Sequence, residues 1–175
     1  ACGGAFWEYL AGCTGDQERF SQSKKEELRM STLLHDVGKM TTPLEVMDKA
    51  ERLSPLQKEA IRHRLEKIGL LAKIACLEGR ITGEAAAETA QRLKDAAVFV
   101  EEVSRAGFLQ DEKLAELEKL RTLTYQDAGG ETQPWLTEDE LEMLSIRKGT
   151  LSPAERKIME DHVVVTDKLL EPLDF

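Results

Sequence analysis

The residues best suited to chemistry are the three histidines of this chain, one of which is followed directly by an aspartate. His35 and Asp36 open the pentapeptide HDVGK, and the other two histidines are His63 and His162. Neighbouring residues on a helix point about 100° apart, so an adjacent His and Asp can serve two metal ions, or one ion and a group behind it. Imidazole together with carboxylate suits Fe, Mn or Zn better than Ca. A bare His-Asp pair is usually a salt-linked pair at the end of a helix, whereas the full pattern His-Asp-x-Gly-Lys is more specific and favours a transition-metal site.

The elements that must position these groups are helices. Apolar residues recur at helical spacing over residues 24–37, and Gly38 is expected to end that helix. The five apolar residues of this segment predict one buried face: Leu28, Met30, Leu33, Leu34 and Val37. Ser54 and Pro55 then restart a helix as its N-cap and first residue.

Two long apolar seams follow, each with successive spacings of 4, 3, 4 and 3 residues. The first contains Ile61, Leu65, Ile68, Ala72 and Ala75, and the second contains Ala86, Ala90, Leu93, Ala97 and Val100. Gly79 closes the first run and Gly83 opens the next, so the pattern predicts an antiparallel helical hairpin. Its role is structural, with signal coupling or dimerisation as the alternative.

The remaining segments also predict helices. One is expected over residues 111–124, and residues 127–133 have the composition of a loop. Thr137 and Glu140 form a capping box, and Pro153 begins a last helix that runs to about Leu170. No strand is expected, so the predicted fold class is all-α.

Composition excludes several classes of protein. The net charge of −9 argues against a general nucleic-acid-binding surface, and no apolar run is long enough for a membrane span. Three scattered cysteines predict neither a disulfide framework nor a thiolate zinc site, which favours a cytoplasmic setting. Because the chain begins at Ala1 and stops at Phe175 after an apolar turn, we expect a fragment.

The pentapeptide from His35 to Lys39 resembles the signature of the HD superfamily of metal-dependent phosphohydrolases. Residues 144–170 resemble the part of HD-GYP domains in which a basic-Gly-x-Leu-Thr/Ser turn leads into a helix with a metal-binding His, here His162. The resemblance implies an HD-type helical bundle with the hairpin inserted. Residues 1–49 form the first part of the HD core, 50–143 the insertion, and 144–175 the second part, which ends before the expected GYP motif.

The resemblance also implies the roles of the site residues. His35 would bind one metal ion, Asp36 would bridge two, and His162 would bind the second; Fe and Mn are typical ions. Lys39 would contact the substrate phosphate or hold the site carboxylates. The implied reaction is hydrolysis of a phosphodiester, such as that of cyclic di-GMP, by a metal-activated water in bacterial signalling. Asp36 and Lys39 are thus the candidate catalytic residues, and sensor domains are the expected attachments.

Some features leave alternatives open. No His precedes His35, and the His-His-Glu and final Asp of the family are not found in these 175 residues. The second hypothesis is therefore a degenerate, non-catalytic HD module for sensing or oligomerisation. His63 lies at a spacing that also suits the second ligand, but the residues around His162 match better. Arg147 and Lys148 are candidates to bind the anionic nucleotide, and an ordinary surface turn explains them equally well.

Overall fold

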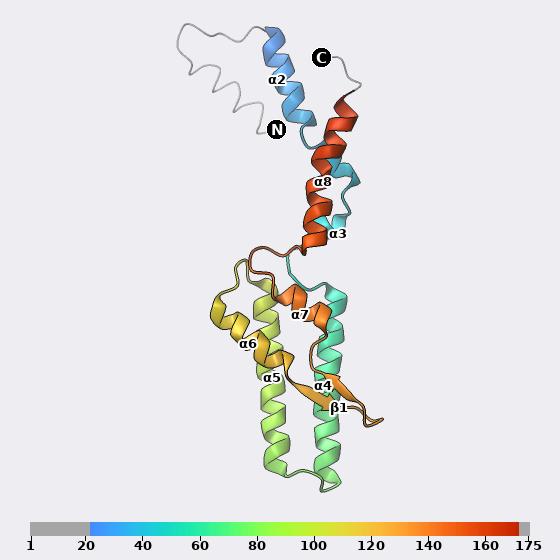
Figure 1. Ribbon diagram of the computed structural model, residues 1–175, viewed down its shortest axis with the longest axis vertical. Helices are drawn as coiled ribbons and strands as arrows, with labels where there is room; N and C mark the ends of the chain where they lie inside the picture. Colours follow the sequence, from blue (N-terminus) through green and yellow to red (C-terminus); the bar gives the residue numbers. More distant parts are fainter. Residues whose placement is uncertain (1–21, 172–175) are drawn as a thin grey trace. The chain divides into compact units, whose positions relative to one another are not determined.

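The computed structural model describes residues 22–171, with side chains from Glu26 onward, and it divides into two compact units (Figure 1). One unit is formed by the residues before Asp48 together with those after Pro153. The other is the continuous stretch Asp48–Pro153. The predicted insertion, residues 50–143, falls within this second unit, which continues past Met143 to Pro153.

The first unit contains the HDVGK pentapeptide and His162, whereas residues 144–153 of the second matched segment belong to the second unit. The described elements of the first unit are α2 (Gln22–Leu34), the 3-10 helix η1 (Val37–Thr41), α3 (Leu44–Met47) and most of α8 (Pro153–Leu170). The expectation that the first helix runs to Val37 is wrong, because α2 ends at Leu34 and the chain then tightens into η1. His35 and Asp36 therefore occupy the turn between the two helices, not an α-helix face.

The apolar stripe predicted for α2 is not buried among the described residues. Leu33 is 65% exposed and Met30 is 42% exposed, while Leu28 and Leu34 are half-buried. Helical spacing of apolar residues identifies a face that is expected to be buried, but it does not indicate which part of the protein buries it.

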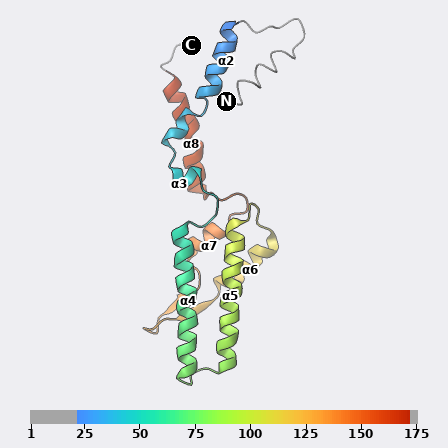
Figure 2. The ribbon, with the colours of Figure 1, turned by 180° about the vertical axis from the view of Figure 1, so that it is seen from behind.

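The second unit is built on the predicted hairpin, which the structure confirms. Helices α4 (Pro55–Leu77) and α5 (Gly83–Arg105) run antiparallel and side by side (Figures 1 and 2). The Ser54 side chain accepts a hydrogen bond from the backbone N–H of Gln57, whose side chain accepts one from Ser54 in return. Gly79 closes the turn at φ +74°, a backbone conformation that disfavours other residues.

A layer of shorter elements covers one side of this helix pair (Figures 1 and 2). It consists of α6 (Asp111–Arg121), β1 (Thr124–Gln126), β2 (Thr132–Pro134) and α7 (Glu138–Leu144). The seam prediction for α5 is partly wrong for this reason: Ala96 is buried and Ala97 is exposed. The buried stripe of α5 is rotated towards the covering layer.

The two strands contradict the expectation of a strand-free chain, although the all-α class holds because the sheet is so small. They pair antiparallel, with Tyr125 opposite Gln133. The Asp127 carboxylate accepts hydrogen bonds from the backbone N–H groups of Gly129 and Glu131, at 2.9 and 3.0 Å. This turn chemistry joins the strands, and it accounts for a hairpin where the composition indicated only a loop.

The core of the second unit lies between the hairpin and the covering layer. It holds apolar side chains from all four helices and from the segment after β2, among them Leu65, Leu93, Leu117, Trp135 and Leu144. The predicted capping box of Thr137 and Glu140 is confirmed, and the buried Glu140 carboxylate also pairs with Arg64 at 2.7 Å. One acidic side chain thus caps α7 and ties it to α4.

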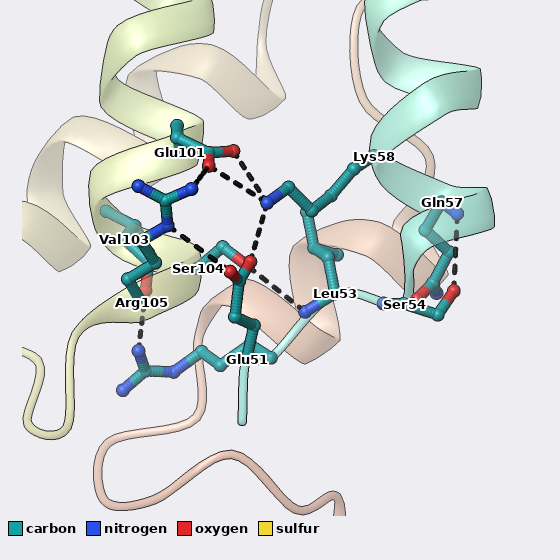
Figure 3. A network of polar contacts seen from close by, with 10 residues as sticks. Glu51, Leu53, Ser54, Gln57, Lys58, Glu101, Val103, Ser104 and Arg105 are labelled. Atoms are coloured by element: carbon teal, nitrogen blue, oxygen red, sulfur yellow. Dashed lines mark hydrogen bonds and ion pairs between the residues drawn. The ribbon is translucent and has the colours of Figure 1, made fainter. Parts of the chain in front are cut away.

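A polar network closes the open end of the hairpin (Figure 3). The Lys58 ammonium lies 2.6 Å from a Glu51 oxygen and 2.9 Å from Glu101. Arg105 reaches the same two carboxylates, and Ser104 accepts the N–H of Leu53 at 3.3 Å. The hydrogen bond from Lys58 lowers the pKa of Glu51, and the hydrogen bond to Glu51 raises the pKa of Lys58.

Arg52 is the largest fully buried side chain of this end. Its guanidinium donates to the carbonyl oxygens of Ile146 at 3.0 Å and Val103 at 2.6 Å, and also to that of Ala106. Burial lowers the pKa of this group. The carbonyls at the end of α5 carry the negative end of the helix dipole, which offsets part of the cost of burying the charge.

Candidate metal centre

Three of the predicted site residues converge on one carboxylate in the first unit. The Nε2 atom of His35 lies 3.2 Å from Oδ2 of Asp36, and Nε2 of His162 lies 3.6 Å from Oδ1. The two imidazoles therefore approach different oxygens of Asp36, although His35 and His162 are far apart in the sequence. The juxtaposition that the sequence suggested is present.

Each of the two imidazoles is oriented by the backbone of its own segment. Nδ1 of His35 lies 2.7 Å from the carbonyl oxygen of Thr32, and Nδ1 of His162 contacts the carbonyl oxygen of Met159. Since a carbonyl oxygen only accepts, both Nδ1 atoms carry a proton and donate it. This fixes the ring orientation and leaves Nε2 of each ring facing Asp36, the arrangement that metal-binding histidines usually have.

Exposure distinguishes the two histidines. The His162 side chain is only 15% exposed, whereas the His35 side chain is 64% exposed and Asp36 is 38% exposed. His162 is therefore held inside the unit, and His35 closes the site from the solvent side.

Lys39 places a positive charge beside the Asp36 carboxylate. Its ammonium donates to Oδ2 of Asp36 at 2.7 Å, one turn further along η1. This hydrogen bond is the main cause of the lowered pKa of Asp36, and it outweighs the effect of partial burial, which acts in the opposite direction. Asp36 is therefore a carboxylate at neutral pH and has the charge that a metal ligand needs.

The close approach of η1 and α8 depends on Gly38. Its N–H donates to Oγ1 of Thr166 at 2.9 Å, and that hydroxyl donates to the carbonyl oxygen of His162 at 2.9 Å. A Cβ atom built on Gly38 would lie 2.1 Å from the His162 carbonyl oxygen, so only glycine fits. The glycine of the HDVGK pentapeptide thus sets the distance between Asp36 and His162.

The chemistry of the donor atoms fits metal ions. A neutral imidazole with its proton on Nδ1 has a lone pair at Nε2. This lone pair and the facing carboxylate oxygen would repel each other unless a second ring proton or a cation lies between them. Two ligands that lie about 2.1 Å from a shared ion are separated by about 3.0–3.4 Å. The observed distances from Asp36 to His35 and His162 are close to this range.

The donors present would supply two protein ligands to each of two ions. His35 and Asp36 would hold one, and Asp36 and His162 the other. Among the described side chains of residues 26–171, no group of three or more His, Cys, Asp or Glu is arranged to hold a metal ion. These residues therefore fit part of a two-metal site, with other positions left for water or further ligands.

The other candidates lie in the second unit. His63 is exposed on α4 and faces Glu59 and Glu66 at 3.5 and 3.7 Å. Arg147 forms an ion pair with Asp111 at 2.9 Å, and Lys148 pairs with Phe108 in an isolated β-bridge. Substrate binding by Arg147 and Lys148 stays a prediction.

Two features of the site were missed by sequence reasoning. Thr166, four residues after His162, buttresses Gly38, and the carbonyls three residues before each histidine orient the rings. A hydroxyl residue one helical turn after a candidate ligand is a signal that could have indicated the first of these.

Comparison with known proteins gives no relative for this chain. No protein-family model matches it, and neither the curated proteins nor the solved structures give a significant match. None of the described helices combines the length and the apolar character needed to cross a membrane.

Proposed function

We propose that this chain carries the metal-binding part of a phosphohydrolase of the HD-GYP type. The observation that carries the proposal is the approach of two backbone-oriented imidazoles to the two oxygens of Asp36. A structural salt link would need only one such partner. Two ring nitrogens directed at separate carboxylate oxygens support a bridging role for Asp36, with one ion bound on the His35 side and one on the His162 side.

When bound, divalent cations such as Fe or Mn supply Lewis acidity, which polarises phosphoryl oxygens and provides a hydroxide nucleophile near neutral pH. The chain's own residues do the positioning. Asp36 is kept ionised by Lys39, and Gly38 and Thr166 hold it at a fixed distance from His162. The Lys39 ammonium is partly exposed beside the carboxylate, where it can bind a non-bridging phosphate oxygen and offset charge that develops there.

The proposed substrate is a phosphodiester of a small nucleotide, namely cyclic di-GMP. The net charge of −9 opposes binding of a long polyanion, whose affinity depends on many basic contacts. A small nucleotide needs only local positive charge from the ions and Lys39. A role in cytoplasmic signalling, with sensor domains attached, follows from the same resemblance.

The test is hydrolysis of cyclic di-GMP by the chain loaded with Mn²⁺ or Fe²⁺, with product formation followed by chromatography. We expect turnover that Asp36→Asn and His162→Gln each reduce by about a hundredfold or more, since each removes a ligand. His63→Gln is the matched control, because that exposed histidine faces only glutamates of its own helix, and it should leave turnover unchanged.

Metal binding without turnover would contradict the enzymatic proposal and favour the non-catalytic sensing or oligomerisation module. The observation that favours this second function is that no group of three or more candidate ligands is found among the described residues. Turnover that survives both Asp36→Asn and His162→Gln would show that the chemistry resides elsewhere.

A further inference from the structure

One face of the α4–α5 hairpin is left uncovered within the second unit. The covering layer of α6, the two strands and α7 lies on the opposite side, and Figure 2 views the pair from its open side. A groove of ≈ 580 Å³ runs between the helices here, with Ile61, Leu65, Leu93 and Val100 among its apolar lining. A second hollow of ≈ 600 Å³ continues it towards the hairpin turn, and Leu93 lines both.

The lining of this open face suits close approach of other helices. Small side chains line it on both helices, namely Gly69, Ala86, Ala87, Ala90 and Ala97. Small residues let helix backbones approach more closely than long side chains allow. Leu70 also lines the hollow and is 59% exposed, so an apolar side chain in this groove lacks cover.

The charges on the rims of the groove are complementary across it. Glu66 on α4 and Lys94 on α5 line the same hollow, as do Lys58 and Glu101. Glu66 lies about 12 Å along α4 from Lys58, and Lys94 lies about 10.5 Å along α5 from Glu101. Since Lys58 and Glu101 are in contact, Glu66 and Lys94 stand at nearly the same level.

At this level the two charges are not paired with each other. Glu66 interacts with Arg62 and His63 of its own helix, and the described structure has no ion pair between Glu66 and Lys94. An acidic and a basic side chain therefore face the open side at matching heights, one on each rim of the apolar groove.

We propose that this face joins two copies of the chain in a two-fold dimer, with the two hairpins forming a four-helix bundle. A symmetry axis parallel to the helices places α4 of one copy over α5 of the other. The rotation sets Glu66 over the Lys94 position of the second copy, and Lys94 over its Glu66 position. A two-fold interface must be self-complementary, and the alternating rim charges satisfy that requirement.

The size of the open face agrees with a second copy of the chain as its partner. Each helix has 23 residues and is thus about 35 Å long, and two helices side by side are about 20 Å wide. The resulting area of roughly 700 Å² approaches the ~800 Å² per partner of a standard protein interface. A single docked peptide helix would cover only about half of it.

The test is sedimentation velocity of the full chain from about 1 to about 100 μM, a range in which a standard interface associates. We expect a mass that rises from 19.6 kDa towards twice that value. Glu66→Lys and Lys94→Glu each place like charges opposite one another at two symmetric positions, and each should weaken the dimer about tenfold or more. The double variant restores opposite signs and should return the dissociation constant to within about threefold of the original.

A second pair of variants tests where the interface lies. Ala97→Glu puts a carboxylate into the groove and should abolish the dimer, whereas Ala60→Glu, at an exposed position of α4 outside the groove lining, should not. Circular dichroism confirms that each variant keeps its helices. A chain that stays monomeric at 100 μM, a dimer unaffected by Ala97→Glu, or single reversals that the double variant does not rescue would each overturn the proposal.

Discussion

Replacing Gly38 by alanine should pull the two halves of the candidate metal centre apart. The added Cβ would lie 2.1 Å from the His162 carbonyl oxygen and 2.7 Å from the Thr166 nitrogen, both of them backbone atoms of α8. An ordinary contact between carbon and oxygen is about 3.3 Å, so α8 or η1 must move by about 1.2 Å. That shift also breaks the hydrogen bond from the Gly38 N–H to Thr166.

The cost of this substitution follows from two contributions. Forcing a methyl group into a packed contact costs about 1–3 kcal/mol, and losing a buried hydrogen bond costs about 1 kcal/mol. A total of about 2–4 kcal/mol corresponds to a decrease of roughly 30- to 900-fold in the amide protection of α8. Hydrogen exchange followed by mass spectrometry measures this for α8 peptides directly.

Gly83→Ala is the matched control for this experiment. A Cβ at Gly83, the first residue of α5, meets nothing within 4 Å, so protection should stay the same or rise slightly. If Gly38→Ala changes the amide protection of α8 by less than about threefold, the close contact at Gly38 does not stabilise the packing of η1 against α8.

Two further predictions concern the polar end of the hairpin. Arg52→Lys removes the forked guanidinium donor that reaches three carbonyl oxygens, so it should lower the free energy of unfolding by about 2–4 kcal/mol. Urea denaturation followed by the fluorescence of the buried Trp135 measures this change, and an unchanged urea midpoint would refute the prediction. Because the pKa of Glu51 is lowered, its stabilising effect is present above pH 4.5 and is lost as the pH falls through the folded-state pKa. Because the pKa of Lys58 is raised, its effect is complete below pH 10.5 and is lost as the pH rises through the folded-state value. Glu51→Gln should flatten the acid side of a plot of urea midpoint against pH, and an unaltered plot would contradict this.

The helices of the second unit could be predicted because their signals are local. Ser54 with Pro55, and Thr137 with Glu140, mark helix starts through hydrogen bonds made within four residues. The seam of α5 was only partly predictable, since Ala96 and Ala97 are the same residue type. Which of the two is buried depends on the side that α6 and α7 cover, and that is decided by contacts distant in sequence.

The candidate site was likewise predictable only where its signals are local in sequence. The motif around His35 and Asp36 indicated two candidate ligands, but the spacing alone did not show that α2 stops at Leu34 and leaves both residues in a turn. The link from Gly38 to Thr166 joins residues 128 positions apart, so no local pattern reveals it. Leu33 of α2 is exposed although it belongs to an apolar stripe, because the pattern does not show which segment packs against that stripe.

The most direct test of the metal centre is Mn²⁺ binding by the metal-free chain, measured from the electron paramagnetic resonance signal of the free ion. We predict that the chain binds Mn²⁺ and that Asp36→Asn and His162→Gln each weaken binding by about tenfold or more, while His63→Gln has no effect. The largest loss is expected for Asp36→Asn, because Asp36 is approached by both His35 and His162. A chain that does not bind Mn²⁺, or one whose affinity is the same in the original protein, Asp36→Asn and His162→Gln, would contradict a metal centre at these residues.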